Sequence, residues 1–147
     1  MHIRGVVDRA RGNQDPVKNV EHYPQLRITS SDGVSGVGVR VAGELDASVE
    51  RQFVDAVSDA LKTSGGAVDV DLTRVTFIDS GGLRGLIRCL TDAQQAGTSL
   101  VLTVTYGPVT RLLAVSGITE LFTFSAASSF RPVRAGDPNH FRSLRGT

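Results

Sequence analysis

The chain offers few side chains that could perform covalent chemistry. The three histidines, His2, His22 and His140, lie toward the two ends of the chain, and Cys89 is the single cysteine. One cysteine cannot form an internal disulfide, and no group of cysteines and histidines has the spacing of a metal site. The sequence therefore predicts no catalytic residue, no metal ligand and no cofactor.

The most informative polar group is the run Asp79-Ser80-Gly81-Gly82, which joins a predicted strand to a predicted helix. Backbone N–H groups are unpaired at the start of a helix, and the helix dipole favours negative charge there. A phosphate on Ser80 would be tolerated at such a position, and the two glycines would allow a partner's backbone to approach closely. The alternative interpretation is that Asp79 or Ser80 only caps the helix and the glycines only form the turn.

Common enzyme motifs match this run poorly. A nucleophile elbow needs Gly-x-Ser-x-Gly with a histidine and an acid elsewhere, whereas residues 78–82 read Ile-Asp-Ser-Gly-Gly. A phosphate-binding loop needs a lysine after its last glycine, and none follows here. Cys89 lies on the flank of an apolar stripe and is predicted to be a small core residue, with a redox role as the alternative. We therefore expect a protein-binding domain rather than an enzyme.

The elements that position this run can be predicted from hydrophobic spacing. Alternating apolar residues predict strands at 26–29, 34–42, 67–78, 100–105 and 121–124, with a turn at 30–33. Apolar residues spaced three and four apart predict three helices. The first begins after Asp46 or Ser48, and the short third lies between Pro108 and Gly117. The second ends at Gly97 and carries Leu83, Leu86, Ile87 and Leu90.

Strands that alternate with helices predict a single α/β domain. Its central sheet should be mostly parallel, with an N-terminal antiparallel hairpin and helices packed on the sheet. The domain is predicted to span residues 25–125, between a flexible arm at 1–24 and a basic flexible tail at 126–147. The loops at 43–48, 79–82 and 106–108 leave the carboxyl ends of strands, so they should gather at one edge of the sheet, where partners tend to bind.

The charge distribution narrows the class of partner. Residues 26–125 hold eight lysines and arginines against eleven acids, whereas residues 126–147 hold four arginines and one aspartate. A mildly acidic body argues against direct binding of nucleic acid. No apolar run approaches the roughly 18 residues that span a bilayer, and the N-terminus lacks the apolar core of a signal peptide. We therefore expect a cytoplasmic protein that does not bind membranes.

Three segments together resemble one known family. They are Gly43-Glu44-Leu45-Asp46, Val70-Asp71-Leu72 and Phe77-Ile78-Asp79-Ser80-Gly81-Gly82-Leu83. In sequence and spacing they resemble the STAS family, the domain of sulfate transporters and of bacterial anti-sigma factor antagonists. The resemblance covers roughly residues 25–125. Because no membrane segments are attached, the chain is most similar to the free-standing antagonists.

This resemblance implies a cycle of partner exchange. An antagonist of this family binds an anti-sigma factor, which is a serine kinase of the histidine-kinase-like ATPase fold, and a sigma factor is released. Phosphorylation of a hydroxyl in the antagonist's motif then separates the complex, because a dianion in the interface repels the partner. The partner-binding residues implied here are Glu44, Asp46, Ser48, Asp79, Ser80, Gly81, Gly82 and Leu83. A monomer or weak homodimer is expected.

The sequence departs from the family pattern at one position. The usual acceptor hydroxyl follows the Asp-Ser pair, and that position is Gly81 here. One hypothesis is an antagonist that phosphorylation cannot switch off, and the other is that Ser80 has become the acceptor. The first is favoured, because a shift of one residue reorients the side chain that a kinase must align. The alternative for the whole chain is a STAS module that senses a small molecule or builds an assembly.

Overall fold

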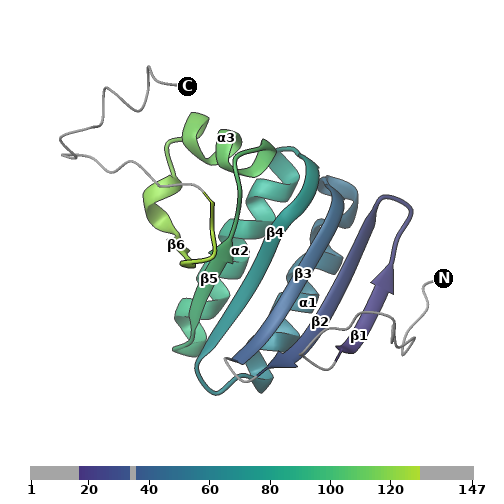
Figure 1. Cartoon of the computed structure of the whole chain (residues 1–147), viewed down its shortest axis with the longest axis vertical. Helices are drawn as coiled ribbons and strands as arrows, with labels where there is room; N and C mark the ends of the chain where they lie inside the picture. The colour runs from purple at the N-terminus through teal and green to yellow at the C-terminus, as the bar shows by residue number, and fades with distance from the viewer. Residues whose placement is uncertain (1–16, 34–35, 130–147) are drawn as a thin grey trace.

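The computed structural model of the chain describes residues 17–33 and 36–129. One sheet of six strands runs in the order β1-β2-β3-β4-β5-β6 (Figure 1). The strands are β1 (Val17–His22), β2 (Leu26–Gly33), β3 (Gly36–Leu45), β4 (Ala67–Ile78), β5 (Ser99–Thr103) and β6 (Thr123–Phe124). The helices are α1 (Glu50–Thr63), α2 (Ser80–Ala96) and α3 (Pro108–Val115), with 3-10 turns η1 (Ala47–Val49) and η2 (Thr119–Leu121).

The pairing of the strands confirms the predicted fold class. Strands β1, β2 and β3 pair antiparallel, and β3, β4, β5 and β6 pair parallel. Helices α1 and α2 lie together behind the sheet in Figure 1. Along β4, Val68 and Val70 are fully buried against this layer, while Asp69 and Asp71 are only partly buried. Because side chains alternate along a strand, the two aspartates point to the opposite face, which α1 and α2 leave open.

The helices form where the apolar spacing predicted them. In α1, Phe53 and Val57 are fully buried, and in α2 the most buried apolar side chains are Leu86, Cys89 and Ala93. The buried stripe of α2 is rotated relative to the predicted one, so Ile87 is 38% exposed. Helix α2 ends at Gly97, as predicted, in the left-handed conformation with a φ of 68°.

The N-terminal side of the sheet differs from the prediction. Strand β1 lies inside the segment assigned to a flexible arm at 1–24, and residues 30–33, predicted to be a turn, continue β2. The apolar spacing does not reveal β1, because the register shifts between Val17 and Asn19. Among the residues of β1 whose burial is described, only Val20 is buried. Residues 1–16 and 130–147, which make up most of the predicted arm and tail, lie outside the described residues.

The last predicted strand is shorter than expected. Residues 121–124 divide into the end of η2 and the two-residue strand β6, with Phe122 buried between them. Leu121 is 56% exposed. In the described part of the chain, no helix has the length and apolar character needed to cross a membrane.

Candidate functional site

Two of the predicted loops meet at the carboxyl ends of β3 and β4. Leu45 pairs with Ile78 at the last position of both strands, so the two loops that follow these strands leave the sheet next to each other. We call the surface formed by residues 43–48 and 79–82 the carboxyl edge. Figure 1 shows it at the end of the sheet where β3 and β4 lead into α1 and α2.

The two glycines of the second loop lie against the backbone of the first. A Cβ atom on residue 81 would lie 2.5 Å from both Cα and Cβ of Ala47. A Cβ atom on residue 82 would lie 2.1 Å from the carbonyl oxygen of Leu45. Real Cβ atoms do not approach backbone this closely, so glycine is required at both positions by packing.

The aspartates of the carboxyl edge cap the elements that follow them. Asp79 accepts a hydrogen bond from the N–H of Gly82 at 3.0 Å and is the N-cap of α2. Asp46 accepts from the N–H of Ser48 at 2.9 Å and from its hydroxyl at 2.5 Å. Asp46 therefore caps the 3-10 turn η1, and α1 begins at Glu50, which is later than the sequence predicts.

An exposed ion pair joins the starts of α1 and α2. The guanidinium of Arg84 donates to the carboxylate of Glu50 through Nε at 3.1 Å and through Nη2 at 3.0 Å. These hydrogen bonds, and then the attraction of the carboxylate, raise the pKa of Arg84 above its ordinary value. The pair links the first turns of the two helices that follow the carboxyl edge.

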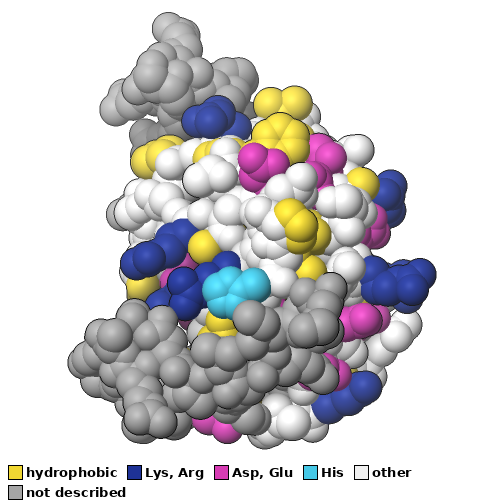
Figure 2. All heavy atoms as spheres, turned by 90° about the vertical axis from the view of Figure 1, so that its right-hand side faces the viewer, with side chains coloured by type: hydrophobic (Ala, Val, Ile, Leu, Met, Phe, Trp, Pro, Cys, Tyr) yellow, Lys and Arg dark blue, Asp and Glu magenta, His cyan; other side chains and the backbone are white. Residues whose placement is uncertain are grey.

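The outer surface of the carboxyl edge is acidic with an aromatic side chain beside it. Glu44, Ser48 and Ser80 are exposed, whereas Asp46, Asp79 and Leu83 are partly buried and Gly81 and Gly82 are buried. Phe77 is 47% exposed and pairs with Glu44 across β3 and β4. In Figure 2, hydrophobic and acidic side chains lie next to one another at the end of the molecule where these strands finish. Phe77 belongs to the motif that resembles the STAS family, but its exposure was not predicted from the sequence.

The third predicted loop, at 106–108, lies at the same end of the sheet (Figure 1). It follows β5, which ends opposite Asp71, and the helix it opens, α3, packs against β4. Tyr106 in this loop is 72% exposed. The close backbone approaches at the carboxyl edge are those between the first two loops.

The comparison with protein families identifies the domain. The model described as "Mlab, STAS domain" matches residues 29–123, which is more than half of the chain.

The chain belongs to the STAS domain family.

Solved structures share the fold of this STAS domain. An anti-sigma factor antagonist from Mycobacterium paratuberculosis is 21% identical, with a TM-score of 0.61 over 71% of this chain and 89% of that one. The anti-sigma factor antagonist SpoIIAA in its unphosphorylated form is 18% identical, with a TM-score of 0.51 over 76% of this chain and 89% of that one. At these identities the likeness concerns the fold.

In this STAS domain the one serine of the 79–82 turn is positioned as a surface residue. Ser80 is the first residue of α2 and is exposed, while Asp79 caps the helix. Of the two roles considered for Ser80, capping therefore belongs to Asp79. The neighbouring position is filled by Gly81, whose backbone is pressed against Ala47.

Cys89 is a core residue of the STAS domain. Its side chain is 1% exposed on the inner face of α2. Burial, and to a lesser extent the charge of Asp92, raise the pKa of the Cys89 thiol well above its usual range. A thiol that stays protonated and buried is a poor nucleophile, so the packing agrees with the predicted core role. Among the described residues, no group of three or more histidines, cysteines and acids is placed to hold a metal ion.

Proposed function

We propose that this STAS domain is an anti-sigma factor antagonist that binds a serine-kinase anti-sigma factor in the cytoplasm and thereby releases a sigma factor. The family of the chain and the antagonists that share its fold support this proposal. The chain acts by binding, and the kinase supplies any chemistry. The proposal therefore depends on a surface, which we assign to the carboxyl edge.

The proposed binding surface consists of the carboxyl edge and the start of α2. Its residues are Glu44, Asp46, Ser48, Asp79, Ser80, Gly81, Gly82 and Leu83. To these we add Phe77, because half-exposed aromatic side chains surrounded by polar groups often contribute most of the energy of an interface. The acids around Phe77 favour a partner that presents positive charge.

The observation that carries the regulatory part of the proposal is the packing of Gly81 against Ala47. The family resemblance places the phosphorylated hydroxyl at this position, and here there is neither a hydroxyl nor space for one. We infer that the antagonist is not switched off by phosphorylation at residue 81. Ser80 is exposed and remains the rival acceptor.

Calorimetry with purified serine-kinase anti-sigma factors from the same organism tests the binding surface. We expect a one-to-one complex, and we expect Phe77→Ala to weaken it by at least tenfold, which corresponds to about 1.4 kcal/mol. Val115→Ala is the matched control, because Val115 is 85% exposed on α3, outside the proposed surface. Equal losses in the two variants would remove Phe77 from the proposed interface, and the absence of any complex would overturn the proposal.

A second candidate function is favoured by one feature of the sheet. Its open face holds a groove of about 410 Å³, lined by both polar and small apolar residues of β2, β3, β4 and β5. A STAS module that senses a small molecule or builds an assembly would use a surface of this kind. Saturable binding of a small molecule, together with failure of every anti-sigma factor to bind, would favour this candidate.

A further inference from the structure

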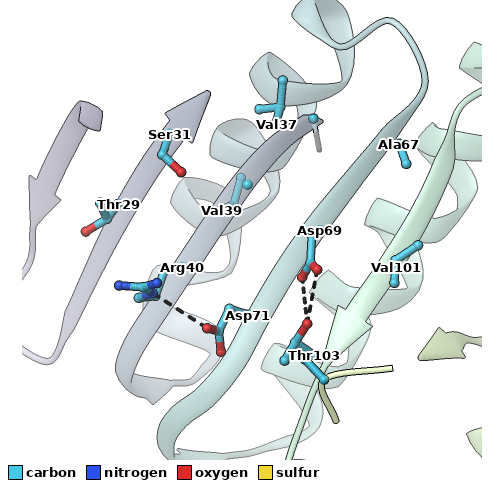
Figure 3. A pocket seen from close by; sticks show the side chains of 13 residues that line it. Thr29, Ser31, Val37, Val39, Arg40, Ala67, Asp69, Asp71, Val101 and Thr103 are labelled. Atoms are coloured by element: carbon cyan, nitrogen blue, oxygen red, sulfur yellow. Dashed lines mark hydrogen bonds and ion pairs between the residues drawn. The ribbon is translucent and has the colours of Figure 1, made fainter. Parts of the chain in front are cut away.

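The groove on the open face of the sheet lies away from the carboxyl edge. It crosses the first half of β4, where Asp69 and Asp71 point outward between Arg40 of β3 and Thr103 of β5 (Figure 3). Gly38 forms part of its floor, and Ala127, which follows β6, forms part of its wall. The groove therefore has a mixed polar and apolar lining that includes two carboxylates.

The two carboxylates have different partners. Asp71 lies 3.6 Å from Nε of Arg40, whereas the oxygens of Asp69 lie 2.9 Å and 3.1 Å from the hydroxyl of Thr103. No cation of the described residues pairs with Asp69. Burial raises the pKa of Asp69, donation from Thr103 lowers it, and repulsion from Asp71 raises it further. A cation placed in the groove would relieve both the burial and the repulsion.

The described chain ends at the rim of this groove. Ser125 shares a hydrogen bond of 2.7 Å with Thr103, so the segment after β6 runs along the end of β5. The N–H of Val104 donates to the hydroxyl of Ser128, and the N–H of Ser129 donates to the carbonyl of Val104. The 18 residues that follow, 130–147, contain four arginines and one aspartate.

We propose that the groove binds the arginine-rich segment 130–147 of the same chain, with an arginine paired to Asp69. Arginine suits the site because its planar guanidinium can donate two parallel hydrogen bonds to one carboxylate. Arg131 follows the anchored Ser129 by two residues, so the segment starts beside its site. A short tether of this kind gives an effective concentration of the order of millimolar, which compensates for a weak contact.

The length of the segment does not limit its reach. An extended chain spans at most about 3.5 Å per residue, and neighbouring strands lie roughly 5 Å apart. A few residues are therefore enough to cross from β5 to β3. This inference is independent of the proposed function, because the groove and the carboxyl edge share no residue.

The test uses the full-length protein with a spin label on the variant Ser143→Cys. The native Cys89 stays unlabelled because it is 1% exposed, and intact mass confirms one label per chain. We expect the amide NMR signals of Arg40, Asp69 and Thr103 to lose intensity, while those of α1, on the opposite face, keep it. About 1 M salt should restore the signals, because the Debye length falls to about 3 Å.

Two substitutions move the docking in opposite directions. Asp69→Asn removes the carboxylate that has no cationic partner among the described residues, and it should reduce the loss of amide signal in the groove. Arg40→Gln removes the cation beside Asp71, so a second carboxylate becomes available and the loss of signal should increase. The amide spectrum of each variant verifies the fold. Equal intensity on both faces of the sheet, or intensity unaffected by Asp69→Asn, would overturn the proposal. So would a loss seen only when labelled and isotope-enriched chains are mixed, because the segment would then bind a second copy.

Discussion

The carboxyl edge and the groove on the open face are built in opposite ways. At the carboxyl edge, backbone packs on backbone, and residues 81 and 82 have no space for a Cβ atom. In the groove, partly buried side chains such as Asp69 and Thr103 surround an open volume of about 410 Å³. The shape of the edge is therefore fixed by the main chain, while the properties of the groove depend on its side chains. Substitutions should therefore lower the free energy of unfolding strongly at the carboxyl edge and only slightly in the groove.

The largest expected effect is that of Gly82→Ala. The new Cβ would lie 2.1 Å from the carbonyl oxygen of Leu45, which is part of β3 and cannot move without breaking the sheet. We expect the free energy of unfolding to fall by about 3 kcal/mol. Urea denaturation measures it. Gly65→Ala is the control, since nothing lies within 4 Å of its Cβ, and an equal effect of both substitutions would show that the edge is not tightly packed.

The next effect is that of Gly81→Ser, which places a hydroxyl at the position where the family resemblance implies the phosphate acceptor. The contact at 2.5 Å with Ala47 should lower the free energy of unfolding by about 2 kcal/mol. Ser80→Ala, at the exposed neighbouring position, should change it by less than about 0.5 kcal/mol. Thermal or urea unfolding of the Gly81→Ser and Ser80→Ala variants measures the difference in stability. A stable Gly81→Ser variant would mean that the edge adapts, and the steric reason for an unswitchable antagonist would be lost.

Substitutions of Asp79 separate stability from binding. Asp79→Ala removes the N-cap of α2 and should lower the free energy of unfolding by about 1 kcal/mol. Asp79→Asn keeps a capping side chain and removes only the charge, so stability should be nearly unchanged while binding of an anti-sigma factor weakens. Urea denaturation and calorimetry on the same samples measure the two effects. Unchanged binding in Asp79→Asn would exclude this carboxylate from recognition.

The smallest effect is expected in the groove. Because the pKa of Asp69 is raised in the folded chain, protonation favours folding, and the stability contributed by this group falls as pH rises through that pKa. Asp69→Asn lacks this dependence, so in about 1 M salt, which should release the arginine-rich segment, its stability relative to the wild type should increase from about pH 4 to pH 7. Urea denaturation at both pH values measures the difference. In low salt the docked arginine should reduce this increase, and a relative stability that decreases with pH even in about 1 M salt would contradict the raised pKa of Asp69.

Much of the fold could be predicted from the sequence, because local patterns determine it. The apolar spacing located α1 apart from its start, the alternation located β4, and Gly97 marked the end of α2. Strand β1 was missed because its register shift breaks the alternation. It is held in place by pairing with β2, and such tertiary pairing leaves little trace in a single segment.

The local geometry of the candidate site could be predicted in part, and its function stays a prediction. The motif located Asp79 and Ser80, but the reason for glycine at residue 81 lies at Ala47, which is distant in the sequence. The exposure of Phe77 depends on how β4 ends beside β3, and the partly buried position of Asp69 depends on which sheet face the helices cover. Contacts between distant segments decide these properties, and no spacing rule encodes them.

The most direct test of the central claim follows the complex with a serine-kinase anti-sigma factor in the presence of ATP. Calorimetry measures the affinity before and after incubation, and intact mass measures phosphate transfer to the antagonist. We predict an unchanged affinity and an unchanged mass, because residue 81 has neither a hydroxyl nor space for one. A gain of one phosphoryl group that weakens the complex and disappears in Ser80→Ala would contradict this account and would identify Ser80 as the switch.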